Sequence, residues 1–233
     1  MSTLLLRLAA PLQAWGDDSR FSIRRSYSIP TKSGVIGLLA SALGRKRNEE
    51  NQDLCALHMG VRVDQPGESL EDFQMVHGIK QADLTRRFYL SDAVFLVGLE
   101  HPDQAFLEKI QLALENPVYP LFLGRRSCPP SYPLVLGIRQ TGLKETLLKE
   151  PWLSAEWRQK RLDHHLRLIL DDDGEPASIR HRLKDEPVSF NPAYRRYRYR
   201  YVKEAGYVEK GDTRATDHDA FGELGVMENE PGR

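Results

Sequence analysis

Apolar and polar residues follow two different periods along the chain, and each period predicts one kind of element. The stretches 3–9, 58–64 and 93–99 are short and largely apolar, which is typical of buried β-strands. Apolar residues instead recur every three or four positions over 30–44 and 102–116, which predicts two α-helices. Proline opens the first helical stretch and glycine closes it, as at many helix boundaries.

A two-stranded β-ribbon is predicted between the second and third strands. Its arms are 73–80 and 87–90, around a polar tip at 81–86. A fourth strand is expected at 118–123, where Pro120 indicates a sheet edge or a bulge. The chain order strand, helix, strand, ribbon, strand, helix, strand is the βαββαβ order of an α+β, ferredoxin-like domain. That fold serves many unrelated functions, so it does not decide the function by itself.

The pattern beyond Gly124 is weaker and predicts a smaller, β-rich C-terminal extension. A helix is expected within 143–157, one strand at 166–170 and another at 194–202. The chain therefore divides into a ferredoxin-like domain over 1–130, the extension over 131–210 and an acidic, loosely ordered tail over 211–233.

The distribution of charge along the chain is informative, whereas the net charge is not. Lysine plus arginine equals aspartate plus glutamate, at 33 each, so the net charge of zero indicates no partner. The segment 17–47 nevertheless holds seven basic and two acidic residues, and 187–203 holds five basic and no acidic ones. From 204 to 233 there are eight acidic and three basic residues. A neutral protein with such basic stretches can bind a polyanion locally.

The cysteines and the N-terminal segment indicate which cellular compartment to expect. Cys55 and Cys128 have neither the spacing of a metal site nor that of a disulfide framework, which favours a reducing, cytoplasmic environment. The N-terminal apolar run is interrupted by Arg7 and is far shorter than the ~20 residues that span a bilayer. We therefore expect no signal peptide, no membrane anchor and no cofactor.

The first candidate site is the polar stretch from 13 to 29 together with the start of the following helix. Basic side chains neutralise phosphates, backbone N–H groups at a helix start attract anions, and aromatic rings stack on unpaired bases. The same composition fits a basic loop whose aromatics pack into the core, with a hydroxyl capping the helix. The candidate RNA contacts here are Trp15, Arg20, Arg24, Arg25, Thr31, Lys32, Ser33 and Gly34.

The second candidate is the loop formed by Gly124, Arg125, Arg126 and Ser127. Glycine permits an unusual backbone angle or a close approach by a ligand. Two arginines after a strand end can clamp a phosphodiester backbone, because each guanidinium donates forked hydrogen bonds. A solvated hairpin tip is the alternative interpretation.

Two further basic segments are less specific. Tyrosine and arginine alternate over 194–202, so a strand there would place tyrosines on one face and arginines on the other, one face packed and the other basic. That arrangement fits RNA, an acidic partner or a solvated surface hairpin. Arg86 and Arg87 are expected at the ribbon tip, where they would reach a nucleic-acid groove, a neighbouring subunit or only solvent.

Signals for catalysis and metal binding are weak. The chain has no P-loop, no G-x-S-x-G and no H-E-x-x-H, and the adjacent histidines at 164–165 diverge on a strand or a helix. A metal-free ribonuclease needs a general base near the attacking hydroxyl and a cation for the transition state. His77 with Lys80, or Tyr27 with Lys32, are the available pairs, and neither has a diagnostic spacing.

Four segments carry a resemblance to a known family. They are L-L-L-R-L-A-A-P-L-Q-A-W-G at 4–16, P-T-K-S-G-V-I-G-L-L-A-S-A-L-G at 30–44, Y-P-L-F-L-G-R-R-S-C-P-P-S at 119–131, and D-E-P-V-S-F at 185–190 followed by R-x-Y-x-x-R. Through these segments the chain resembles the CasD subunits of type I-E CRISPR Cascade complexes. Most of the candidate residues fall inside the matching segments, whereas Arg24 and Arg25 rest on charge alone.

The resemblance implies a RAMP-type, RRM-like domain in which the ribbon is an inserted thumb. It implies a non-catalytic RNA-binding subunit that grips the 5′ handle of the guide RNA, or crRNA. The partners it implies are the CasC backbone subunits, whose filament it caps, and the large subunit CasA, with target DNA reached indirectly through the complex. The alternative is a metal-independent endoribonuclease that processes precursor crRNA, as relatives in type I-C systems do.

Overall fold

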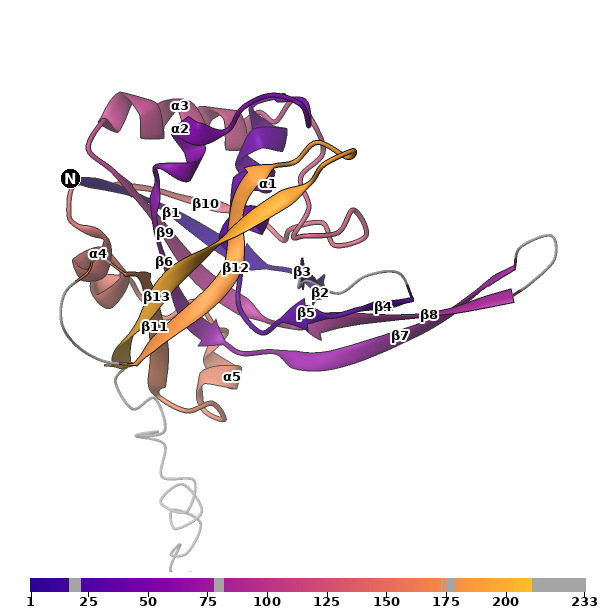
Figure 1. Cartoon of the computed structure of the whole chain (residues 1–233). Helices are drawn as coiled ribbons and strands as arrows, with labels where there is room; N and C mark the ends of the chain where they lie inside the picture. Colours follow the sequence, from indigo (N-terminus) through magenta and orange to yellow (C-terminus); the bar gives the residue numbers. More distant parts are fainter. Residues whose placement is uncertain (17–21, 78–81, 173, 175–178, 211–233) are drawn as a thin grey trace, which may run out of the picture.

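The computed structural model describes the chain except residues 17–21, 78–81, 173, 175–178 and 211–233 (Figure 1). Arg20 and the acidic tail therefore lie outside the described residues. The molecule is built on a seven-stranded sheet with helices on both faces, and a long two-stranded ribbon projects from one side (Figure 1).

The centre of the sheet contains β1 (Ser2–Ala9), β6 (His58–Gln65), β9 (Val94–His101) and β10 (Val135–Arg139), in the order β10-β1-β9-β6. Each neighbouring pair is antiparallel. Because side chains alternate across a strand, Leu4, Leu6 and Leu8 enter one apolar core while Leu5 enters another on the opposite face. This double burial explains why β1 reads as an uninterrupted apolar run.

The prediction of a strand at 118–123 is wrong. The fourth strand of the central sheet is β10, which pairs with β1. The backbone N–H groups of Val118 and Tyr119 donate to the carbonyls of Ala42 and Ser41 at the end of the first helix. The N–H of Leu123 donates to the Cys128 carbonyl within its own loop. A segment whose donors are committed in this way, and which contains a proline, cannot form a strand ladder.

Two main helices cover the first core. The helix α1 (Lys32–Ala42) is capped by Thr31, whose hydroxyl accepts a hydrogen bond from the Gly34 N–H, and α3 (Gln104–Glu115) is capped by Asp103. Buried residues occur nearly all round α1, as expected for a helix enclosed on several sides. It packs between the central sheet and the C-terminal strands, with the short α2 (Gln52–Cys55) near its end (Figure 1).

The C-terminal strands continue the same sheet beyond β6, in the order β11 (His165–Asp171), β13 (Arg196–Glu209) and β12 (Arg180–Ser189). Both strands predicted in this region are found, whereas β12 was not predicted. The helix expected within 143–157 is shorter, because α4 (Leu143–Lys149) ends just before Pro151 and only α5 (Glu156–Gln159) follows. The second apolar core lies under α4.

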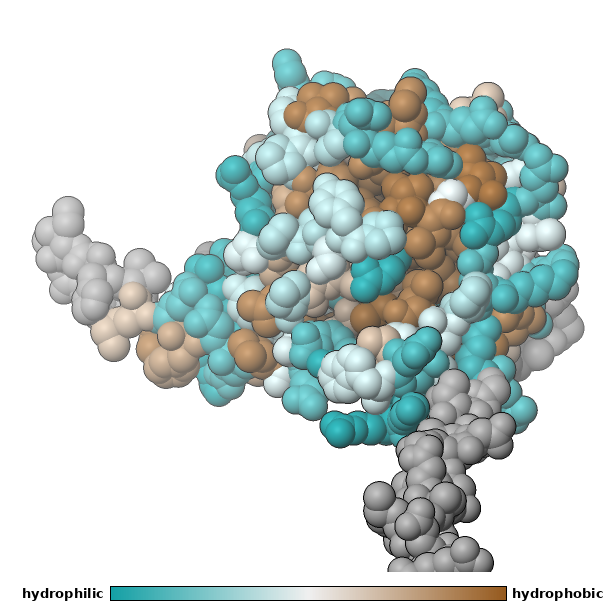
Figure 2. All heavy atoms as spheres, turned by 180° about the vertical axis from the view of Figure 1, so that it is seen from behind, coloured by the Kyte–Doolittle hydropathy of each residue, from teal (hydrophilic) through white to brown (hydrophobic). Residues whose placement is uncertain are grey.

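The predicted ribbon is present as the antiparallel pair β7 (Glu68–His77) and β8 (Ala82–Ser91). Short strands flank its base: β2 (Leu12–Gln13) and β4 (Ile23–Arg24) pair with β8, and β3 (Trp15–Gly16) pairs with β5 (Ser26–Tyr27). Seen from behind, brown apolar and teal hydrophilic side chains mix along the projecting ribbon (Figure 2). The exposed apolar residues there include Phe73, Met75 and Leu84.

Candidate nucleic-acid interface

The base of the ribbon brings together segments that are far apart in the sequence. The loop after Leu123 reaches across to Arg24, because Nη2 of Arg125 donates a 3.1 Å hydrogen bond to the Arg24 carbonyl. The same guanidinium lies 4.5 Å from the ring centroid of Tyr89 on β8. Three separate segments therefore meet at Arg125.

Gly124 fixes the path of this loop. Its φ of +86° is a conformation that glycine adopts without strain, and a Cβ built there would lie 1.6 Å from the carbonyl oxygen of Ala14. The Ala14 N–H also donates a 3.1 Å hydrogen bond to the Leu123 carbonyl. Of the two roles expected for Gly124, the structure shows the unusual backbone angle and a close approach by the chain's own backbone.

Arg125 combines a fixed position with an unused donor. The side chain is half-buried, held by the Tyr89 ring on one side and the Arg24 carbonyl on another. Among the described residues, its buried Nη1 has no hydrogen-bond partner. A buried N–H group without an acceptor costs about 1–3 kcal/mol, so this nitrogen would gain from a ligand acceptor if a small shift of the loop opened it to the ligand.

The other predicted arginines differ in how exposed their side chains are. Arg24, Arg25 and Arg126 are exposed, and Ser127 is exposed beside them. Arg87 is half-buried in β8 and pairs in parallel register with Arg24 of β4, so two arginines lie on neighbouring strands. Positive charge therefore gathers at the base of the ribbon.

Neither Arg86 nor Arg87 is at the ribbon tip, which corrects the expectation for both, because they lie in the middle of β8. Arg86 lies opposite Phe73, and its backbone N–H donates to the Ser22 carbonyl. Its guanidinium forms an ion pair with Glu71, and the hydrogen bond from Arg86 lowers the pKa of that carboxyl. Arg86 therefore already has an acidic partner in the chain.

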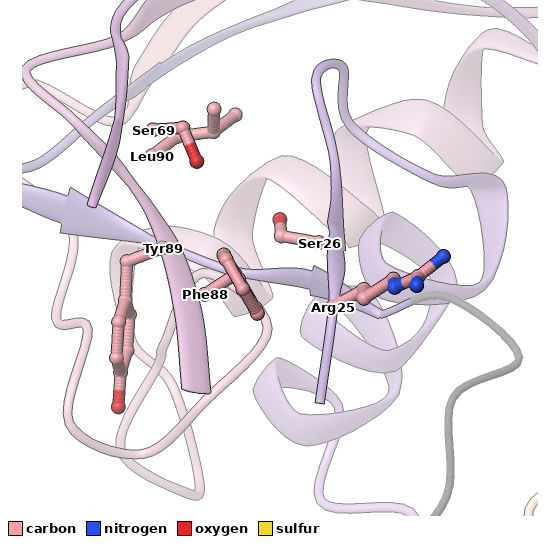
Figure 3. A pocket seen from close by; sticks show the side chains of 6 residues that line it. All are labelled: Arg25, Ser26, Ser69, Phe88, Tyr89 and Leu90. Carbon is pink, nitrogen blue, oxygen red and sulfur yellow. The ribbon is translucent and has the colours of Figure 1, made fainter. Parts of the chain in front are cut away.

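Two cavities open at the same place. The smaller, of about 160 Å³, is lined by Arg25, Ser26, Ser69, Phe88, Tyr89 and Leu90, which come from the ribbon and from the β4–β5 segment (Figure 3). The larger, of about 420 Å³, is lined mostly by apolar surface and extends toward the start of β11. Ser69 and Leu90 line both cavities, so the two adjoin at the ribbon base.

Trp15 and residues 31–34 at the start of α1 pack in the core beneath this region. Trp15 is 1% exposed, and its ring atom Cε3 would lie 2.8 Å from a Cβ at position 34. Its indole N–H donates to Gln13, so the ring is packed and not available for stacking on a base. Thr31 is the helix cap, and Ser33 and Gly34 are half-buried beside it.

Lys32 requires a correction. It is 6% exposed, its Nζ lies 3.1 Å from Asp171, and its backbone N–H donates a 2.7 Å hydrogen bond to Asp185. Arg200 also bridges these two aspartates. The anion site expected at the helix start is thus occupied by the chain's own carboxylates, since Asp171 and Asp185 come from β11 and β12. Lys32 joins the helix to the C-terminal strands and is not available to a phosphate.

In the strand where tyrosine and arginine alternate, the arginines do not share one environment: Arg200 turns inward, whereas Arg195, Arg196 and Arg198 are exposed. Arg200 is 9% exposed and donates to Asp185 from Nε at 2.7 Å and from Nη2 at 2.8 Å. Burial alone would lower the pKa of Arg200, but the hydrogen bonds to Asp185 and the charge of Asp171 raise it overall. Tyr199 and Tyr201 are half exposed.

The candidate catalytic pairs receive no support from this geometry. Lys32 is committed to Asp171, which removes it as a cation beside Tyr27. The His77 side chain and Lys80 lie outside the described residues. In the part of the chain that the structure describes, no group of three or more His, Cys, Asp or Glu side chains could hold a metal ion. None of the described helices is long and apolar enough to cross a membrane.

Sequence reasoning missed Tyr89 and the two aspartates. Tyr89 lies two positions after Arg87 in β8, so strand alternation could have placed both on one side, but nothing local indicated that Arg125 would lie on its ring. Asp171 and Asp185 are far from Lys32 in sequence, and their meeting depends on the sheet order.

Comparison with known proteins assigns the family. The model of the CRISPR-associated protein family Cas_Cas5 (Cas_Cas5d) matches residues 3–203. The chain belongs to the Cas5 family. This Cas5 chain is similar to the CRISPR system Cascade subunit CasD of Escherichia coli (strain K12), at 33% identity over 198 residues that cover 74% of this chain and 88% of the relative.

Two solved structures share the fold of this Cas5 chain. A chain of a CRISPR RNA-guided surveillance complex is 30% identical, with a TM-score of 0.77 over 91% of this chain and 95% of that one. A Cas protein crystal structure is 40% identical, with a TM-score of 0.69 over 90% of this chain and 98% of that one. These matches confirm the resemblance that the four sequence segments carry, and they confirm a mixed α/β fold with antiparallel sheets.

Proposed function

We propose that this chain is a non-catalytic RNA-binding subunit of a type I-E CRISPR surveillance complex. It grips the 5′ handle of the crRNA, caps the filament of CasC subunits and contacts CasA, and it reaches target DNA only through the complex. It works in the cytoplasm. We assign its β1-α1-β6-β9-α3-β10 core to the ferredoxin-like, RAMP-type fold, with β7–β8 as the thumb.

The observation that carries this proposal is the state of Arg125. Its guanidinium is positioned by Tyr89 and the Arg24 carbonyl, while its buried Nη1 has no acceptor among the described residues. A phosphate oxygen is a strong acceptor for such a group, and a charge-assisted bond is shorter and stronger than a neutral one. The geometry of Arg125 therefore fits one phosphate of a nucleic-acid backbone.

The surroundings of Arg125 suit the neighbouring phosphates and the bases of a single RNA strand. Arg24 and Arg126 are exposed close by along the chain path, which suits neighbouring phosphates. The adjoining cavities of about 160 Å³ and 420 Å³ offer partly apolar walls to unpaired bases. Binding of this kind holds the backbone and shape of the guide, while base pairing reads the target.

Guide retention in the reconstituted complex tests the proposal. Because Arg126 is exposed, Arg126→Ala removes a charge without disturbing the core, and Arg125→Ala removes the positioned donor. Each phosphate contact contributes about 0.7 to the slope of log affinity against log salt for single strands, so the double variant is expected to lower that slope by about 1.4. Lys109→Ala, which removes one exposed charge on α3, is the control for each single arginine variant and should leave the slope unchanged. An unchanged slope in the double variant would remove this loop from the site.

The purified chain, assayed without the other subunits, distinguishes binding from catalysis. Repeat-containing precursor RNA incubated without metal should be bound and remain intact. Specific cleavage that is lost in Tyr27→Phe would instead identify the chain as an endoribonuclease.

A further inference from the structure

The larger cavity at the ribbon base lies beside the strand from which the acidic tail continues. His165 lines this cavity and pairs with Glu209 at the end of β13. The backbone N–H of Lys210 donates a 3.1 Å hydrogen bond to the His164 carbonyl, so the chain is held against the start of β11 up to that residue. The acidic tail, residues 211–233, therefore begins at one edge of the larger cavity.

This cavity suits apolar side chains better than charged ones. Its volume of about 420 Å³ is within the range of ligand sites, and most of its lining surface is apolar. The charged side chains in its wall already have partners within the chain, in the pairs Asp64–Arg62, Arg167–Glu204 and Asp163–His165. A ligand therefore gains most here by burying apolar surface.

Positive charge lies beyond the edge that the two cavities share. Ser69 and Leu90 line both cavities, and Arg25 lines the smaller one. Arg24 and Arg126 are exposed at the same ribbon base, and neither forms an ion pair with a carboxylate among the described residues. An occupant that fills the larger cavity and continues past this edge needs acidic groups next to apolar ones.

The tail has that composition and a sufficient length. It holds six acidic and two basic residues, and its apolar side chains are Phe221, Leu224, Val226 and Met227. Its 23 residues extend to at most about 80 Å, whereas a compact chain of 233 residues has a radius of gyration of about 17 Å. The tail can therefore reach the whole ribbon base.

We propose that the acidic tail docks at the ribbon base as an internal substitute for guide RNA. Phe221 and Leu224 enter the larger cavity, and tail carboxylates lie against Arg24 and Arg126. This inference rests on the proposed function, because the docked tail covers the surface assigned to the 5′ handle. Only chains with an open site bind RNA, so docking lowers the apparent affinity of the guide-free chain for any single strand.

Attachment favours the tail over a separate occupant. A segment tethered by a short flexible linker has an effective concentration on the order of mM, so even weak contacts are occupied. A partner subunit or a second copy has to supply the same apolar and acidic groups without that advantage. The docked tail is displaced when a guide brings phosphates to the same arginines.

The RNA affinity of the full-length chain, measured without guide or other subunits, tests whether the tail closes the site. Phe221→Ser with Leu224→Ser keeps every charge but removes the side chains assigned to the cavity, so affinity for a single-stranded RNA of unrelated sequence should rise. Two exposed ion pairs, at a factor of about 1.4 to 5 each, set the expected rise at about 2- to 25-fold.

The matched control for this pair is Phe221→Leu with Leu224→Phe, which keeps both side chains apolar and should bind RNA as the natural chain does. If the serine variant also binds as the natural chain does, or if the control gains as much affinity as the serine variant, the inference is overturned. Either result would mean that the tail acts through its charge alone or does not act on this site.

Photo-cross-linking locates the docked segment directly. In the full-length chain, p-benzoylphenylalanine in place of Phe221 should cross-link to the segments that line the larger cavity, at 28–29, 66–69 and 162–167. Guide RNA should abolish these cross-links. Cross-links only to other surfaces, to a second copy or to another subunit would assign the cavity a different occupant and overturn the inference.

The two proposals fail in different ways. If the handle lies elsewhere, Arg125→Ala with Arg126→Ala leaves guide retention unchanged, and guide RNA leaves the tail cross-links in place. If the tail does not dock, the arginine variant still loses guide retention, while the serine variant leaves RNA affinity unchanged.

Discussion

Replacing Gly124 by alanine should damage the arginine loop more than any ordinary loop substitution. The new Cβ would lie 1.6 Å from the Ala14 carbonyl oxygen, whereas Cβ atoms essentially never approach closer than 3.0 Å. The two segments must therefore separate by about 1.4 Å, a collision with backbone that overpacking data put at ~1–3 kcal/mol. A left-handed backbone adds ~1–2 kcal/mol for a residue with a Cβ. The expected loss in free energy of unfolding is about 2–5 kcal/mol.

Urea denaturation of the variant and of a matched control separates the two contributions. Gly206 has a φ of +92° and nothing within 4 Å of its built Cβ, so Gly206→Ala carries the backbone strain without the collision. It should lose only ~1–2 kcal/mol. In the assembled complex, Gly124→Ala should also weaken guide retention, because the displaced loop moves Arg125 away from Tyr89. A loss for Gly124→Ala no larger than for Gly206→Ala would show that the Ala14 carbonyl does not collide with the new Cβ.

Three further predictions follow from contacts elsewhere in the molecule. Asp185→Ala should cost about 3–5 kcal/mol in urea denaturation, because it leaves the buried Arg200 without its bidentate partner; a loss below 1 kcal/mol would contradict that pairing. Gly34→Ala should cost about 1–3 kcal/mol by forcing a methyl group against the indole beneath it, and unchanged stability would show that the helix start can shift. NMR titration should place the pKa of His165 above 6.5, since the Asp163 carboxylate accepts a hydrogen bond from its ring, and Asp163→Asn should lower it. Because the folded pKa is raised, this contact stabilises the fold below pH 6.5 and is lost as the pH rises through the folded value, and an identical pKa in both proteins would exclude the contact.

The central elements of the fold were readable from the sequence because each is strongly periodic. β1, β9 and both main helices lie where their apolar patterns placed them. The fourth strand was misplaced because residues 118–123 are apolar for a different reason, namely that Leu121 and Leu123 bury their side chains while the backbone bonds to α1 and to its own loop. Hydrophobicity reports burial, and it does not say where the backbone hydrogen bonds go.

The candidate site was predictable in composition but not in pairing. Sequence indicated that the arginines after Gly124 form a loop, and the structure places Arg125 at the meeting point of three segments. The sequence could not show that Lys32 forms an ion pair with Asp171, because the two residues are 139 positions apart. The alternation of tyrosine and arginine over 194–202 likewise predicted two different faces. It could not show that Arg200 is buried, because that depends on carboxylates supplied by β11 and β12.

A cryo-EM structure of the assembled complex with its guide would locate the 5′ handle relative to Arg125. We expect a handle phosphate oxygen about 3 Å from the Arg125 Nη1 that has no partner in the described chain, with the Tyr89 contact retained. A handle that runs along another surface, with Nη1 turned to a protein carbonyl or to solvent, would contradict this expectation.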